Sequence, residues 1–390
     1  MSNIIHGWVG TNNFSTCAEH VGVLRSVEGG NMPHVLARLS AHIRAVRSIA
    51  PAGVARAHNG NPAASLRLER LYGCPVLLSG LASLALTSAE VAVVHQHYKV
   101  NLERLLKLHR NTPECVVMFL AGSLPATALL HLRNLSLLGM IARLGPSNIL
   151  HQHGLHILLS SRREKSWFTS VRLVCLQYSL PDPLLILQAP SSKETWKRFT
   201  KSKVLDFWEK KFQAQAALLP SLESFKSSYM SLTTPHPLYT SAHSPFEVRK
   251  AVIVARMLSG RYRTDRLARH WSRTNPSGLC KLLGCTGKEM GDLQHILLYC
   301  PALSVTRSSQ LKLWSKLMAS RQYLSPIIAP LTLQEGTFVQ LLLDPSSIPS
   351  VISANQVRSD VLPCCFYLSR TWVYAIHLKR TKLQKLWNLI

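Results

Sequence analysis

A quartet of metal-binding residue types is the sequence feature that most constrains how this chain can fold. Cys280 and Cys285 are separated by four residues, nine residues follow, and His295 and Cys300 are again separated by four. Three thiolates and one imidazole can complete a tetrahedral Zn²⁺ site, and a short first loop lets the chain fold back on the ion. The pattern predicts one structural zinc ion. The alternative is a set of ordinary buried thiols with a histidine nearby.

The residues around the quartet fit a metal-binding turn. Gly284 and Gly287 flank the second cysteine, where a tight loop needs backbone freedom. The run from Leu293 to Tyr299 is expected to be helical, which would place His295 and Cys300 about one turn apart and facing the same ion.

The balance of charge predicts an anionic partner. The 390 residues include 45 Lys and Arg against 19 Asp and Glu, which gives a formal net charge of +26. Such an excess attracts phosphate groups and releases their counterions, so RNA or DNA is the expected partner. A ribosome-associated or organellar protein that is basic for other reasons is the alternative.

Composition and periodicity predict a mainly α-helical fold. Apolar residues make up 47% of the chain but aromatic residues only 7%, and Leu and Ala are frequent. A short strand is expected over 17–26, and proline-rich, loop-like segments over 181–190 and 326–349. Helical patterns are expected over 33–49, 63–72, 77–86, 88–109, 125–141, 191–219 and 245–258, from beyond 301 to 323, and over 362–387.

The nine cysteines and the apolar stretches bear on the compartment. Outside the quartet and the pair Cys364–Cys365 the cysteines stand alone, so a reducing, intracellular location, nuclear or cytoplasmic, is expected. The N-terminus lacks the pattern of a signal peptide. Prolines, glycines and charged residues interrupt the apolar stretches 71–94 and 116–144, which predicts buried helices and no membrane partner.

The helix expected over 191–219 is the first candidate for contact with nucleic acid. Lys197, Arg198 and Lys201 alternate there with Trp and Phe residues. Aromatic side chains can stack on bases while the cations hold phosphates. Alternatively, the two residue types are the buried and solvated faces of one amphipathic helix.

The segment just before the quartet is the second candidate. Its basic residues are Arg261, Arg263, Arg266 and Arg269. A basic segment attached to a small zinc-binding loop is expected to contact phosphates. Alternatively, its arginines are simply exposed to solvent.

Catalytic motifs do not accompany these binding candidates. The first aspartate is Asp182, and no two acidic residues are adjacent, so a pair of neighbouring aspartates for metal-assisted phosphoryl transfer is missing. The sequence also contains no glycine-rich phosphate loop, no Gly-x-Ser-x-Gly and no His-Glu-x-x-His. We expect no catalytic residues and no enzymatic activity of the chain alone.

Several segments are similar, in residue pattern and in their order along the chain, to segments of one known protein family. They are AEHVGVLRS at Ala18–Ser26, a Leu-Tyr-Gly helix at Arg67–Gly80, and the helix end and basic turn at Met257–Asp265, before the quartet and Pro301. In this the chain resembles the reverse-transcriptase protein of non-LTR (LINE-type) retrotransposons. The segments resemble, in turn, the strand after the palm, the thumb helix, and the basic turn with its Cys-Cys-His-Cys knuckle. The first two cysteines are separated by four residues, where two are usual in such knuckles.

The resemblance implies a division into three parts and a function. It implies a thumb-like helical region over 1–160, a linker with a basic amphipathic helix over 161–243, and a zinc-knuckle-bearing region over 244–390. In the family these parts grip template RNA and primer. Polymerase activity is not implied, because the palm with its catalytic aspartates and the endonuclease have no counterpart here.

Other interpretations of the same sequence remain open. The chain could be an accessory part of a reverse transcriptase that acts with a palm-bearing chain. It could also be a fragment of a decayed element with no function, or a helical protein that binds a partner and whose charge is incidental.

Overall fold

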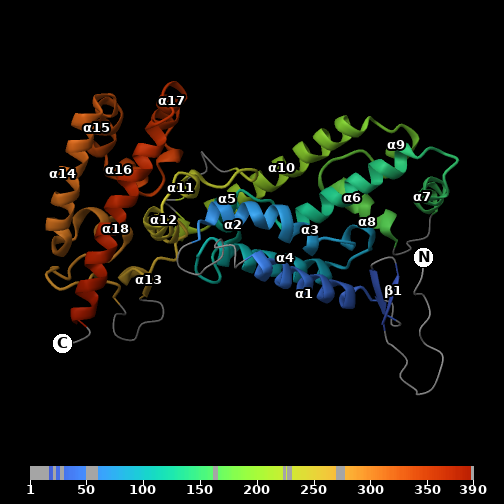
Figure 1. Ribbon diagram of the computed structural model, residues 1–390, viewed down its shortest axis with the longest axis horizontal. Helices are drawn as coiled ribbons and strands as arrows, with labels where there is room; N and C mark the ends of the chain where they lie inside the picture. Colours follow the sequence, from blue (N-terminus) through green and yellow to red (C-terminus); the bar gives the residue numbers. More distant parts are fainter. Residues whose placement is uncertain are drawn as a thin grey trace, which may run out of the picture.

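The computed structural model describes residues 17–20, 23–26, 30–49, 60–160, 166–222, 225, 231–268 and 277–387. Over these residues the chain forms eighteen α-helices, short 3₁₀ and π turns, and one two-stranded hairpin, so the predicted mainly α-helical fold is confirmed. The molecule is elongated, with the hairpin and the green helices of residues 149–188 at one end and the C-terminal helices, orange and red, at the other (Figure 1).

The first described segment is a hairpin rather than the single strand predicted over 17–26. β1 (Cys17–His20) pairs antiparallel with β2 (Val23–Ser26). The prediction of a single strand is wrong, because the two halves of this apolar run pair with each other. A glycine within such a run is compatible either with one continuous strand or with a turn between two.

The next helices follow the predicted pattern with one register change. α1 (Met32–Ile49) contacts β2, and α2 (Pro62–Leu68) runs through a π turn (Glu69–Gly73) into α3 (Cys74–Leu77). Gly73 and Pro75 therefore do not interrupt the helix, because the π turn changes the hydrogen-bond register ahead of the proline. The helix predicted over 77–86 is wrong. Gly80 takes φ +73°, and only a 3₁₀ turn (Leu81–Ser83) follows.

A seven-helix bundle is built from the middle of the chain. Its first helix begins with a capping box in which Thr87 and Glu90 each bond the other's backbone N–H. The Glu90 carboxylate also accepts from the N–H of Asn31 at 3.0 Å, which fixes the start of α1. The helices are α4 (Ser88–Leu105), α5 (Glu114–Ala121), α6 (Ala126–Arg143), α7 (Ile149–Leu159), α8 (Trp167–Gln177), α9 (Pro183–Gln188) and α10 (Lys193–Ala217).

The apolar helices α5 and α6 form the centre of this bundle. All side chains of α5 from Cys115 to Ala121 are buried. Among the described residues no single helix has both the length and the apolar character to cross a membrane. Only α5 and α6 taken together meet those two criteria, and they are bent by 63° at their junction.

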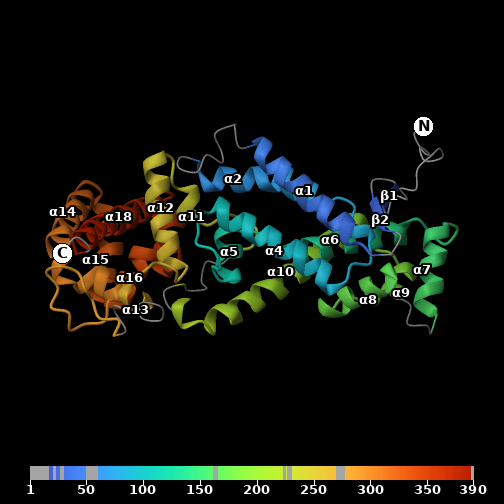
Figure 2. The same cartoon turned by 90° about the horizontal axis from the view of Figure 1, so that it is seen from below.

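The helices after α6 pack back onto it. The proline-rich stretch 181–190, predicted to be a loop, contains α9, which lies against α6, α7 and α8. α10 crosses α5 and α6, and its Trp196 indole donates to the carbonyl of Leu135 at 2.7 Å. Figure 2 shows α10 along one side of the molecule.

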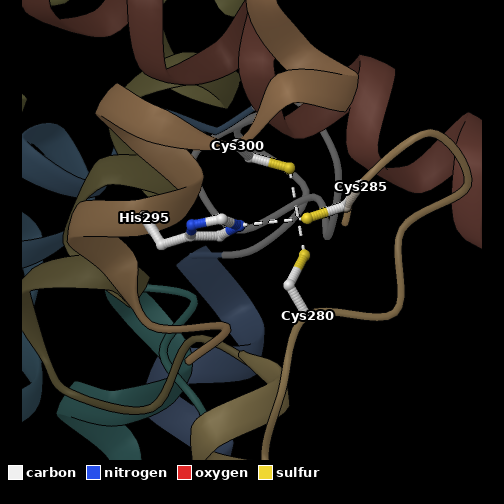
Figure 3. Close-up of side chains that lie close together, drawn as sticks. All are labelled: Cys280, Cys285, His295 and Cys300. Carbon is white, nitrogen blue, oxygen red and sulfur yellow. Dashed lines mark hydrogen bonds between the residues drawn. The ribbon is translucent and has the colours of Figure 1, made fainter. Parts of the chain in front are cut away.

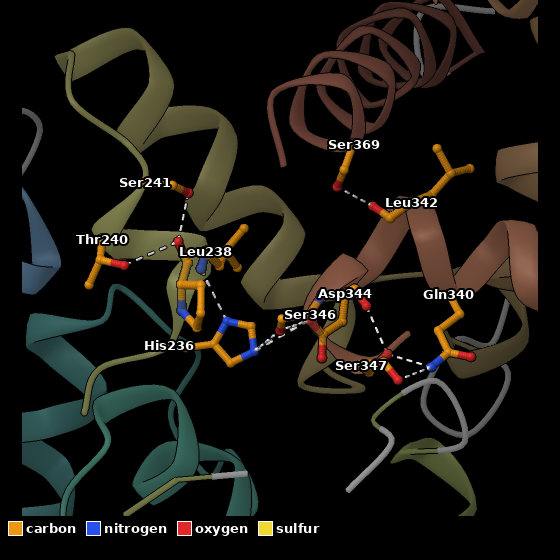
Figure 4. A network of polar contacts seen from close by, with 11 residues as sticks. His236, Leu238, Thr240, Ser241, Gln340, Leu342, Asp344, Ser346, Ser347 and Ser369 are labelled. Atoms are coloured by element: carbon orange, nitrogen blue, oxygen red, sulfur yellow. Dashed lines mark hydrogen bonds and ion pairs between the residues drawn. The ribbon is translucent and has the colours of Figure 1, made fainter. Parts of the chain in front are cut away.

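Two helices join this bundle to the C-terminal part. They are α11 (Pro237–Thr240) and α12 (Pro245–Leu258), and the predicted N-cap Ser244 accepts from the N–H of Glu247. Figure 4 shows His236 at the start of α11 beside Asp344 and Ser346, all of them buried. His236 Nε2 lies 3.5 Å from an Asp344 oxygen, so buried polar groups, and not only apolar contacts, fix the junction.

Beyond Pro301 the described chain is helical almost throughout, including the segment 326–349 predicted to be loop-like. Its prolines stand mostly at the first helical positions, where the missing N–H costs nothing, so they begin helices. α12 lies along the last helix, whose Trp372 packs against Trp314 and Phe338. The helices are α13 (Asp265–Ala268), α14 (Ser304–Ser320), α15 (Ser325–Leu333), α16 (Glu335–Leu343), α17 (Pro349–Val357) and α18 (Val361–Trp387).

Candidate metal centre and basic turn

The four predicted ligands come together at one point. One donor atom from each of Cys280, Cys285, His295 and Cys300 lies within 4.8 Å of the other three. The Sγ atoms of Cys280 and Cys300 are 3.9 Å apart, and Cys285 Sγ is 3.6 Å from His295 Nε2. Figure 3 shows the four side chains converging from different stretches of the chain. The cluster can hold one metal ion.

A tight loop brings the first two cysteines to the site. Residues Leu279 and Met290 form an antiparallel bridge, and the N–H of Cys280 donates to the carbonyl of Glu289 at 2.9 Å. Between these strands the chain turns through Gly284 at φ +87° and Gly287 at φ +68°. Side chains other than glycine rarely adopt this backbone region, so the two glycines permit the turn.

The histidine and the last cysteine come from one turn of helix. His295–Tyr299 form a π turn, and the N–H of Cys300 donates to the carbonyl of His295 at 2.7 Å. The wider π turn brings residues five apart to the same side, which explains how the helical run delivers both ligands. Cys280, His295 and Cys300 are buried, and Cys285 is partly exposed.

Two carboxylates orient the histidine. Glu289 Oε2 lies 2.6 Å from His295 Nδ1, so Nδ1 carries the proton and Nε2 points its lone pair at the cluster. Asp292 Oδ1 accepts from the backbone N–H of His295 at 2.8 Å. Neither Glu289 nor Asp292 is among the site residues predicted from the sequence. Metal-bound histidines usually donate a hydrogen bond to a carboxylate. The sequence places both acidic residues between the second cysteine and the histidine, which makes them candidates for that acceptor.

The two buried thiols also interact with each other. Cys280 donates a hydrogen bond to Cys300, which raises the pKa of Cys280, with burial as a second cause. The same bond lowers the pKa of Cys300. One thiolate is therefore favoured within this pair, and an incoming cation would displace the remaining proton.

The basic segment before the quartet is attached to the metal loop. Arg266 Nη1 lies 3.6 Å from Asp292 Oδ2, and the N–H of Arg266 donates to the carbonyl of Gly291 at 3.2 Å. Arg261 and Arg263 are exposed, and Arg261 Nη2 donates to the carbonyl of Asn111 at 2.9 Å. Arg269 lies outside the described residues. We call Arg261–Arg266 the basic turn.

The basic residues of α10 lie elsewhere in the molecule. Lys197, Arg198 and Lys201 are exposed, whereas Trp196, Trp208 and Phe212 are buried in the bundle. Phe207 is half-buried, and Phe199 is exposed. Most of the aromatic residues are thus unavailable for stacking on bases. α10 begins beside α9, at the end of the molecule away from α13, so the structure does not bring these cations to the basic turn (Figures 1 and 2).

Comparisons with known proteins add no relative. The chain matches no protein family model, no curated protein and no solved structure.

Proposed function

We propose that the quartet binds one structural Zn²⁺ and that the chain is a nucleic-acid-binding protein. The geometry of the donors supports zinc. In a tetrahedron with Zn–S of about 2.3 Å and Zn–N of about 2.05 Å, sulfurs lie about 3.8 Å apart and sulfur lies about 3.6 Å from nitrogen. The observed separations are 3.9 Å between Cys280 and Cys300 and 3.6 Å between Cys285 and His295.

The donor set and its burial favour zinc in a structural role. Three thiolates and one imidazole form a closed four-ligand set with no position left for water or substrate. Such a zinc ion contributes folding free energy, because its ligands come from two separate stretches of the chain that meet only in the folded protein.

The observation that carries the proposal is a shared carboxylate. Asp292 bonds the backbone of the metal ligand His295 through one oxygen and contacts the guanidinium of Arg266 through the other. Metal binding at His295 thereby fixes the base of the basic turn. The exposed cations Arg261 and Arg263 are then presented at a defined place, as phosphate contacts require.

The wider charge supports nucleic acid as the ligand. A formal charge of +26 would favour binding to a polyanion through release of its counterions. The resemblance to the C-terminal part of a non-LTR reverse transcriptase supports the same function, with RNA or DNA as partner and no polymerase activity. An accessory role beside a palm-bearing chain would use the same surface.

The test is RNA binding over a salt series with the triple variant R261A/R263A/R266A. Each phosphate contact removed should reduce the slope of log affinity against log salt by about 1, so the triple variant should lose about 3. A variant with the same loss of charge, R143A/K312A/K316A, changes exposed residues outside the metal loop and should keep more of the slope.

Two further measurements complete this test. The variant K197A/R198A/K201A tests whether α10 also contacts RNA: a reduced salt slope would include these residues in the binding surface, and an unchanged slope would exclude them. Zinc content of the R261A/R263A/R266A variant must equal that of the wild type, because Arg266 contacts Asp292. A slope unchanged by R261A/R263A/R266A would exclude the basic turn as a contact.

A further inference from the structure

Arg380 on α18 is a buried cation that contacts Tyr262 but forms no ion pair with a carboxylate of the described residues. Its side chain is only 4% exposed, and its Nε and Nη2 atoms are buried and make no hydrogen bond. Its guanidinium lies over the ring of Tyr262, 5.4 Å from the centroid. A buried charge with no counter-charge is strongly unfavourable, so its retention calls for an explanation.

The groups around Arg380 are also basic. The Tyr262 hydroxyl is 2.9 Å from His377 Nδ1, which places His377 beside the same ring. Arg256, at the end of α12, donates through Nε to the carbonyl of Lys107 at 3.0 Å. We call Lys107, Arg256, His377 and Arg380 the junction cluster, because α12 lies along α18 and bonds the loop after α4 through Arg256.

The arginines and the lysine of this cluster are cationic, and they act on the pKa of the histidine beside them. Burial lowers the pKa of His377, and the charges of Arg380 and Arg256 lower it further. The pKa of Lys107 is lowered by burial and then by Arg256. Among the described residues, no carboxylate forms an ion pair with any member of the cluster.

The backbone at the cluster is held in a defined shape. Lys107 takes φ +57° and Asn111 takes φ +63°, so the loop after α4 bends sharply at both ends. Arg256 bonds the carbonyl of Lys107, and Arg261 bonds that of Asn111. These contacts fix the loop carbonyls against α12 and the basic turn, and they use only one nitrogen of each arginine.

We propose that the junction cluster is a binding site for phosphate groups of a multiply charged anion. Guanidinium groups match phosphate oxygens in geometry and bind them through charge-assisted hydrogen bonds. An anion there would satisfy Arg380 and neutralise its neighbours, which removes the cost of burying them. The ligand is either a free polyphosphate or the backbone of a nucleic acid. The inference does not rest on the proposed function, because a free polyphosphate can bind where RNA does not.

The experiment measures tripolyphosphate binding by full-length protein at constant ionic strength. Tripolyphosphate should raise the Tm of the wild type in a concentration-dependent way. The variant R380M keeps a long apolar side chain but no charge, and it should weaken tripolyphosphate binding by about tenfold or more. Without the anion, R380M should melt no lower than the wild type, because an unpaired buried charge has been removed.

The matched control is R358M. Arg358 also stacks on a tyrosine, with its guanidinium 3.7 Å from the Tyr323 ring, but it is paired with Asp360 at 2.9 Å. R358M should leave the tripolyphosphate response unchanged. RNA is then added as competitor: displacement of tripolyphosphate identifies backbone phosphates as a ligand, and no displacement identifies a free polyphosphate.

Three results would overturn the proposal. It would fail if tripolyphosphate raised the Tm of wild type and R380M equally, or of neither. A lower Tm of R380M in anion-free buffer, together with an unchanged tripolyphosphate affinity, would show instead that Arg380 is a purely structural residue.

Discussion

Glu289 offers the sharpest test of the metal centre, because it acts on the metal only through His295. Its carboxylate lies 2.6 Å from His295 Nδ1, yet its side chain is 60% exposed. Replacing it removes little buried surface, so the fold of the metal-free chain should hardly change. The variants are Glu289→Gln, which keeps an oxygen that accepts the Nδ1 proton, and Glu289→Ala, which keeps none.

The expected magnitude follows from this contact. Carboxylates that hold a metal-bound histidine typically contribute 10- to 100-fold in metal affinity, so Glu289→Ala should weaken zinc binding by about 1.4 to 2.7 kcal/mol. Glu289→Gln should fall at the lower end, because it loses the charge but keeps the hydrogen bond that orients the ring.

The assay is competitive titration of zinc against a chelator of known affinity. Glu335→Ala is the control, since Glu335 is also exposed and accepts a hydrogen bond from Gln294, the neighbour of His295, but touches no ligand. Its zinc affinity should equal that of the wild type. Equal affinities of wild type and Glu289→Ala, or an equal loss in Glu335→Ala, would refute the role assigned to Glu289.

Two predictions concern stability rather than the metal. Burial lowers the pKa of His131 to about 4, and its Nδ1 lies 2.8 Å from the Tyr178 hydroxyl. Since the folded pKa lies below the unfolded value of about 6.5, the folded chain binds fewer protons, and about 3 kcal/mol should be lost as the pH falls from 6.5 to 4. His131→Asn keeps an acceptor for Tyr178 but does not titrate, so denaturant titrations should show a flatter profile; an identical pH dependence would contradict the reasoning. Trp372 is buried against Trp314, and Trp372→Ala should cost about 3 to 5 kcal/mol by the same assay. A loss below 1 kcal/mol, the range of surface substitutions, would show that this aromatic cluster is not a core.

The sequence predicted which four residues come together at the candidate metal centre, because their spacing along the chain is the signal. Cys280, Cys285, His295 and Cys300 lie within one short segment, so no long-range folding information was needed to group them. Glu289 and Asp292 lie in the same segment, but isolated acidic residues are common, and only the fold reveals which hydrogen bonds they make.

Helices were predicted where an apolar stripe and a cap coincide, as at Ser244 before α12. The errors lie where a residue type has two structural uses. Proline ends helices but is also common at their first positions. The prolines of the stretch that holds α15–α17 therefore fit both the predicted loops and the observed helices. Likewise, aromatic residues among cations on α10 fit both a stacking surface and a buried face, and the choice depends on packing against α6.

The junction cluster could not be predicted from the sequence. Lys107, Arg256 and Arg380 are far apart along the chain, and nothing local distinguishes them from other basic residues. They are brought together only when α12 packs along α18 and Arg256 of α12 bonds the loop after α4.

The measurement that tests the central claim most directly is RNA affinity of the full-length protein over a salt series, before and after zinc is removed by a chelator. We expect one zinc ion per chain and an RNA affinity that falls steeply with salt. Once zinc is removed, the affinity should be weaker and its salt slope smaller, because Asp292 no longer fixes Arg266 through a metal-bound His295. A protein that contains no zinc, or whose salt-dependent binding is unchanged by zinc removal, would contradict the central claim.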